Sequence, residues 1–142
     1  MVLAAGCVTA AEEMAFETVA QEASSGHDEA KNYVITDEAG WLGVWEKITS
    51  NQFPQSPPPA IDFENNVLIG VFMGQRSSGG YGVEITKVVD QGGSVDVQYT
   101  EYSPGRTCIV TQALTAPYHV IKIAKTNAPV QFTANRTTVA CE

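Results

Sequence analysis

The sequence predicts an α+β domain built mainly of antiparallel strands, as a sandwich or a small barrel-like sheet, with one amphipathic helix packed on it. Apolar and polar residues alternate in several short stretches of the second half, as in strands with one buried face. These stretches recur about every ten residues between Gly- or Pro-containing turns. Only 17% of the residues are charged, and 12 Gly and 7 Pro fit a turn-rich β protein better than a helical one.

The chain length of 142 residues favours a single domain with a core of its own. Residues 1–30 are rich in Ala, Glu, Gln and Ser. We interpret them as an N-terminal tether with one short strand near residues 16–20, followed by one globular domain over residues 31–142.

A strand is expected at residues 33–35, followed by a helix with Thr36 as its N-cap. Apolar residues between Trp41 and Ile48 recur at spacings of three and four, which gives one wide apolar face. Trp41 and Trp45 lie on this face, so core packing is the favoured interpretation. The alternative is a ligand pocket between the helix and the sheet.

The rest of the chain predicts six strands, at residues 67–73, 81–86, 95–99, 108–114, 118–124 and 130–132. Turns are expected at residues 90–93 and 103–105, which are rich in Gly, Pro, Asp and Ser. The first of these strands is continuously apolar, which indicates burial on both faces.

The three cysteines point to an oxidising compartment. The stretch from Leu3 to Cys7 resembles the end of a bacterial lipoprotein signal, which predicts acylation of Cys7; an incidental cysteine is the alternative. Cys108 and Cys141 would then remain as a pair for a disulfide worth about 3–4 kcal/mol in the chain-entropy model, or as two buried free thiols.

The charge and the motifs exclude several classes of function. A net charge of −8 argues against nucleic acid and against docking on anionic lipid, so membrane contact is expected only through a lipid anchor at Cys7. No nucleophile–base motif and no metal-ligand spacing is present, so we expect no enzyme, metal or cofactor. His27 falls in the expected tether, and His119 falls in a strand, where a structural role is favoured.

A Gly-rich loop at residues 74–81 is the sharpest candidate site. One interpretation is a long hairpin loop whose glycines adopt positive φ. The other is a recognition loop in which Arg76 and Tyr81 make the contacts, since both residue types are enriched at interface hot spots. The candidate residues are Arg76, Ser77, Ser78, Gly79, Gly80 and Tyr81.

Two stretches of the chain resemble the PrcB C-terminal domain family. One runs from Asp62 through the Gly-rich loop to Ile85, and the other runs from Cys108 to Ile123. The resemblance covers residues 61–132. It implies a location in the bacterial cell envelope and a protein-binding role, because the family is named after a lipid-anchored subunit of a surface protease complex. A peptidase is the partner that this resemblance implies.

Residues 76–81 also resemble a loop of chagasin-type cysteine-peptidase inhibitors. The sequence therefore predicts a non-enzymatic envelope lipoprotein domain that binds another protein and stabilises a surface peptidase complex. The alternatives are a peptidase inhibitor and a small-ligand-binding envelope protein.

Overall fold

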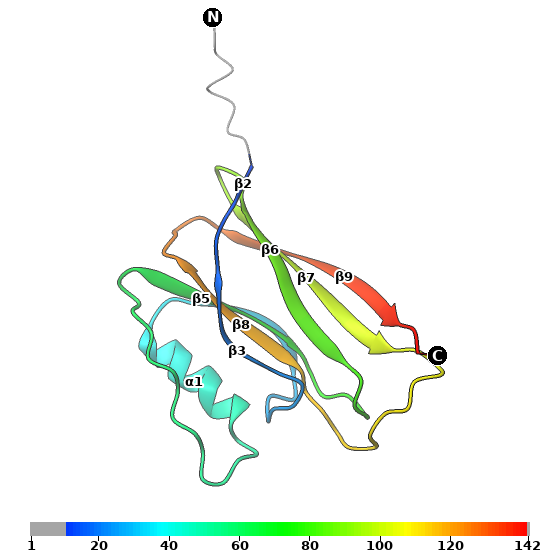
Figure 1. Ribbon diagram of the computed structural model, residues 1–142. Coiled ribbons are helices and arrows are strands. Elements are labelled where there is room, and N and C mark those ends of the chain that lie inside the picture. Colours follow the sequence, from blue (N-terminus) through cyan, green and yellow to red (C-terminus); the bar gives the residue numbers. More distant parts are fainter. Residues whose placement is uncertain (1–10, 142) are drawn as a thin grey trace, which may run out of the picture.

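The computed structural model describes residues 11–141 and has two four-stranded sheets and one helix (Figure 1). The α+β class predicted from the sequence is confirmed. The elements are β2 (Glu12–Glu13), β3 (Glu17–Glu22), β4 (Ala30–Ile35), α1 (Glu38–Ile48), β5 (Asn66–Met73), β6 (Gly82–Asp90), β7 (Val95–Pro104), β8 (Tyr118–Ala124) and β9 (Val130–Val139).

The two sheets differ in the order of their strands. The β7 sheet has the order β2-β6-β7-β9, and the β5 sheet has the order β3-β8-β5-β4. Neighbouring strands pair antiparallel, except that β9 runs parallel to β7. β8 lies between β7 and β9 in the chain but belongs to the other sheet. The connection between the parallel strands β7 and β9 therefore crosses over through the β5 sheet.

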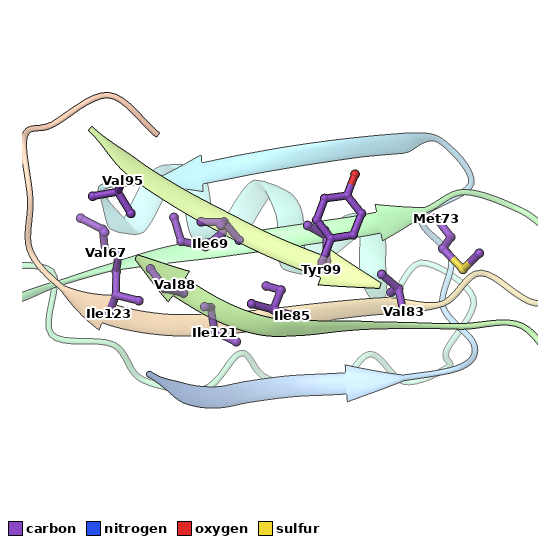
Figure 2. Packing of buried hydrophobic residues seen from close by; sticks show 12 residues of the cluster. Val67, Ile69, Met73, Val83, Ile85, Val88, Val95, Tyr99, Ile121 and Ile123 are labelled. Carbon is purple, nitrogen blue, oxygen red and sulfur yellow. The ribbon is translucent and has the colours of Figure 1, made fainter. Parts of the chain in front are cut away.

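Strand β5 is buried on both faces, as its continuous apolar run predicts. Val67, Ile69, Val71 and Met73 join the larger core between the two sheets, where Figure 2 shows side chains from β5, β6, β7 and β8 converging. The intervening residues Leu68 and Phe72 pack instead with α1. Successive side chains of β5 point to opposite faces of the sheet and therefore pack into two different cores.

Helix α1 begins one residue later than expected. Asp37, rather than Thr36, is the N-cap, and its carboxylate accepts a hydrogen bond from the Gly40 N–H at 2.8 Å. Asp37 has extended backbone dihedrals, which lets its side chain reach the first free N–H groups of the helix.

The two tryptophans are structural, as predicted. Trp41 is 1% exposed in the core beneath the helix. Its indole N–H donates to the Pro59 carbonyl at 2.9 Å, and that of Trp45 donates to the Ser56 carbonyl at 2.8 Å. The helix thereby holds the Pro-rich connector that follows it.

The fold begins earlier than the domain boundary expected near residue 30. The short strand expected near residues 16–20 is β3, which pairs with β8, while β2 pairs with the end of β6. Residues 12–22 therefore belong to the sheets rather than to a tether, because β8 and β6 each offer them an open edge. Cys7 lies outside the described residues.

Two expectations about the C-terminal third are wrong. Residues 108–114 are not a strand, and the residue that follows them, Thr115, forms an isolated bridge to Arg76. The last strand does not end at residue 132 but continues to Val139 in unbroken register with β7. Backbone pairing and not apolar content sustains its second half, whose residues are exposed on both faces.

Among the residues that the structure describes, no helix is long and apolar enough to cross a membrane.

Candidate functional site: the loop end

Four loops gather at one end of the molecule, which we call the loop end: residues 23–29, 49–60, 74–81 and 105–117 (Figure 1). Strand β2 and the β6–β7 turn lie at the opposite end of the sheets. Residues from all four loops line one polar pocket of about 270 Å³, among them Ser24, Asn51, Gln75 and Leu114. The loop end is therefore a continuous surface.

The candidate loop 74–81 is paired to loop 105–117. Arg76 and Thr115 exchange backbone hydrogen bonds of 2.7 and 3.0 Å, and the Gly79 N–H donates to the Thr111 carbonyl at 3.0 Å. The Thr115 hydroxyl donates to the Ser78 carbonyl at 2.8 Å. These bonds give the loop a fixed conformation.

The glycines of this loop have two structural roles. Gly74 and Gly80 have φ of 82° and 94°, which side-chain-bearing residues rarely adopt. A Cβ on Gly79 would lie 2.4 Å from the Thr111 hydroxyl oxygen, so this glycine permits the close approach of the two loops. The positive φ expected of the glycines is confirmed at these two positions, whereas the expected hairpin is wrong, because β5 and β6 belong to different sheets and the loop crosses between them.

Arg76 and Tyr81, the two expected contact residues, face each other. The guanidinium carbon of Arg76 lies 5.5 Å from the centre of the Tyr81 ring, within the range of a cation–π contact. Both residues are half-buried. Their first role is to fold the loop, and only part of each remains free for a partner.

The disulfide between Cys108 and Cys141 is present, as predicted. It joins loop 105–117 to the residues that follow β9. The Gly105 N–H donates to the Val139 carbonyl at 2.8 Å, and the Thr107 hydroxyl donates to the Cys141 carbonyl. The start of the loop is thus fixed to the last strand.

Large apolar side chains are exposed on these anchored loops. Ile109 and Phe53 are fully exposed at 101%, and Leu114 is 63% exposed. The strand expected at Ile109 is absent, although apolar and β-branched residues there are typical of strands. Exposed residues of this size on loops held by hydrogen bonds and a disulfide are typical of interaction surfaces rather than of cores.

Three of the four loops at the loop end differ in charge from the rest of the chain. Loops 49–60, 74–81 and 105–117 contain no Asp or Glu, whereas the chain carries 16 acidic residues. Their charged residues are Arg76 and Arg106, of which Arg106 is exposed. The fourth loop, residues 23–29, carries Asp28 and Glu29, so the apolar and weakly basic surface is confined to the other three loops.

His27 lies in loop 23–29 and is buried, which the sequence did not predict. It is 2% exposed, its ring stacks on Phe72 with centroids 4.2 Å apart, and its Nε2 lies 2.7 Å from the Tyr33 hydroxyl. Burial lowers the pKa of His27 and raises that of Tyr33. His27 therefore anchors the loop as a neutral side chain.

His119 links the two sheets, which confirms the structural role expected for it. Its Nδ1 accepts the Ile85 N–H at 2.9 Å, so the neutral ring carries its proton on Nε2. That N–H donates to the Thr18 hydroxyl oxygen at 2.8 Å. Burial lowers the pKa of His119. The Ile85 N–H in β6 is thus bonded by a side chain of the other sheet.

Within residues 11–141, no group of three His, Cys, Asp or Glu side chains is placed to hold a metal ion. The space between α1 and the β5 sheet, where a ligand pocket was the alternative, is filled by buried side chains that include Trp41, Ile48, Leu68 and Val120.

Comparison with known proteins gives one family. No curated protein and no solved structure matches the chain. The PrcB C-terminal family is not known as a catalytic one. Its model matches residues 67–124, from the buried strand β5 through the Gly-rich loop to the end of β8, and the resemblance to the PrcB C-terminal domain is confirmed over that segment.

Proposed function

We propose that this protein is a non-enzymatic component of the bacterial cell envelope that binds another protein through its loop end. The observation that carries the proposal is the exposure of Ile109 and Leu114 on a loop that a disulfide and the Gly-rich loop hold in place. Exposed apolar anchors lose little conformational entropy on binding when their backbone is already fixed.

The surface favours a particular kind of partner. The apolar side chains need a partner with apolar pockets, and Arg106 at their side favours an acidic or neutral rim. Arg76 and Tyr81 support the surface and contribute the parts of their side chains that remain exposed. A peptidase is the partner that the PrcB resemblance favours.

The geometry suits a lipid anchor at Cys7. Strand β2 starts at Glu12, five residues after Cys7, and lies at the end of the sheets opposite the loop end (Figure 1). In this proposal acylated Cys7 attaches the β2 end of the molecule to the membrane. The loop end then faces away from the membrane, toward the partner protein.

The test is affinity purification of the full-length precursor from its native envelope, with mass spectrometry of the co-purified proteins and of the N-terminus. The Ile109→Ser, Leu114→Ser double variant should lose the stoichiometric partner. The matched control is Leu42→Ser, which changes a side chain 45% exposed on α1 and should retain the partner. Equal recovery with both variants would refute the role of the loop end.

The same preparation separates the proposed roles. Diacylglyceryl-modified Cys7 is expected if the lipid anchor is correct, and an unmodified Cys7 would contradict it. A peptidase that stays active in the complex indicates a supporting subunit, whereas inhibition of a papain-like enzyme by the purified domain would favour the inhibitor alternative.

A further inference from the structure

The outer edge of β9 is the longest free strand edge in the described part of the chain. β9 has ten residues, pairs only with β7 and forms the border of its sheet (Figure 1). Unpaired N–H and C=O groups along such an edge can pair with another strand, so proteins usually protect them.

The other sheet edges carry such protection. β2 has two residues, and the edge strands β3 and β4 have six residues each. β3 carries Glu17 and Glu22 at its ends, and β4 carries Lys31. Short length and charged side chains are the usual devices against edge-to-edge pairing.

β9 has less of this protection. It contains no Pro, and its register with β7 runs without a bulge from Val130 to Val139. Its one charged residue, Arg136, is paired with Glu101 of β7 at 3.1 Å. The Gly105 N–H bond to Val139 and the Cys108–Cys141 disulfide hold the far end of the strand extended.

We propose that β9 pairs antiparallel with β9 of a second copy of this chain, about a two-fold axis through Asn135. A two-fold axis perpendicular to the sheet does not exchange the two faces of the sheet. Two residues that face each other across the axis therefore have side chains on the same face, so both have odd numbers or both have even numbers. With the axis at Asn135, residue i faces residue 270 − i, and residues 131–139 pair.

This register gives favourable cross-strand neighbours. Thr133 faces Thr137, Phe132 faces Thr138, and the two Asn135 side chains meet at the axis. Threonine pairs and pairs of an aromatic with a β-branched residue are among those that stabilise sheets. Arg136 faces Ala134, whereas a register with its axis at Arg136 would place two arginines opposite each other.

The second copy is favoured as the occupant because the strand complements itself in this register without a like-charge pair. The net charge of −8 per copy opposes association at long range. Salt screens that repulsion over about 8 Å at physiological ionic strength. The dimer is therefore expected to tighten as salt is added, whereas pairing with a basic foreign strand would weaken.

The test is sedimentation equilibrium of the full chain up to millimolar concentration, with Cys7→Ser in every sample to prevent an intermolecular disulfide. The Cys7→Ser chain should dimerise reversibly. Asn135→Lys and Asn135→Asp each place like charges at the axis and should each weaken dimerisation by about tenfold or more. Thr86→Lys, on the exposed face of β6, is the matched control and should dimerise as the parent does.

A mixture of the Asn135→Lys and Asn135→Asp chains should restore dimerisation as a heterodimer, because the two charges then face each other. Circular dichroism checks that both variants are folded. A chain that stays monomeric at millimolar concentration would overturn the proposal, as would a dimer unaffected by either substitution or a mixture that fails to associate.

Discussion

Strands β5 and β9 show two ways in which this chain makes a strand. All but the first residue of β5 are buried, with two cores on its two faces, whereas the second half of β9 is exposed on both faces. β5 is held by the burial of its side chains, and β9 by backbone pairing to β7 and by a disulfide just after its end. Burial in β5 stabilises the fold, whereas the second half of β9 leaves its side chains and its outer edge accessible.

The largest expected difference between the strands is the cost of removing a side chain. Phe72→Ala in β5 removes a ring that stacks on His27 and on Tyr118, and it should lower the free energy of unfolding by about 3–5 kcal/mol. Thr138→Ala in β9 should change it by no more than about 0.5 kcal/mol. Chemical denaturation measures both, and equal effects would contradict the comparison.

Removing the disulfide should affect the β9 side of the molecule selectively. The Cys108→Ser, Cys141→Ser double variant opens a link between residues 33 positions apart. It should lose about 3–4 kcal/mol in the chain-entropy model. Hydrogen exchange should then show faster exchange at residues 135–139 and at loop 105–117, with β5 still protected. Uniform acceleration along the chain would argue against two differently held strands.

Removing the His119 ring tests the link between the sheets. His119→Ala leaves the Ile85 N–H and the Thr18 hydroxyl without their partner, at a cost of about 1–3 kcal/mol. His119→Gln keeps an acceptor near the Ile85 N–H and should cost less. A loss as large for glutamine as for alanine would mean that packing, and not the hydrogen bond, is what the ring contributes.

The smallest expected effect is the pH dependence of stability. Burial lowers the pKa of both His27 and His119, so the unfolded chain binds more protons than the folded one below the unfolded value of about 6.5. The free energy of unfolding should therefore decrease as the pH is lowered from about 7 to about 5. A His27→Gln, His119→Gln variant should have a flatter profile in thermal melts, and an unchanged slope would exclude these two rings as the cause.

The strands that could be predicted from the sequence are those held by side-chain burial. β5, the first part of β6, the first half of β7 and β8 carry apolar runs or alternation, so their existence and position followed from the residues alone. The second half of β9 carries no such signal, because its partner is the backbone of a strand 35 residues earlier. Parallel pairing of this kind depends on strand order, which local pattern does not encode.

The opposite error occurred at residues 108–114. Ile109 and Val110 have the β-branched side chains typical of strands. The structure places them in a loop, because the disulfide ties the start of this segment to the residues after β9 and backbone hydrogen bonds tie its later part to loop 74–81. An apolar residue left without a core is then exposed. That exposure is seen only in the structure, and it supports the proposed binding role.

The sequence places His27 in an expected tether, because residues 1–30 are rich in Ala, Glu, Gln and Ser. The structure buries it because the loop folds back onto Phe72 and Tyr33, and the Gly26 N–H bonds to the Ile48 carbonyl at the end of α1. Burial of a polar ring in a Ser- and Gly-rich loop depends on contacts far apart in sequence, and composition alone does not predict it.

The most direct test of the loop end as a binding surface is site-specific photo-crosslinking in the native envelope. A photoreactive amino acid replaces Ile109 in one precursor and Thr86, on the exposed face of β6, in another. We expect one defined crosslinked partner from position 109 and none from position 86. Equal labelling from both positions, or no crosslink from position 109, would contradict it.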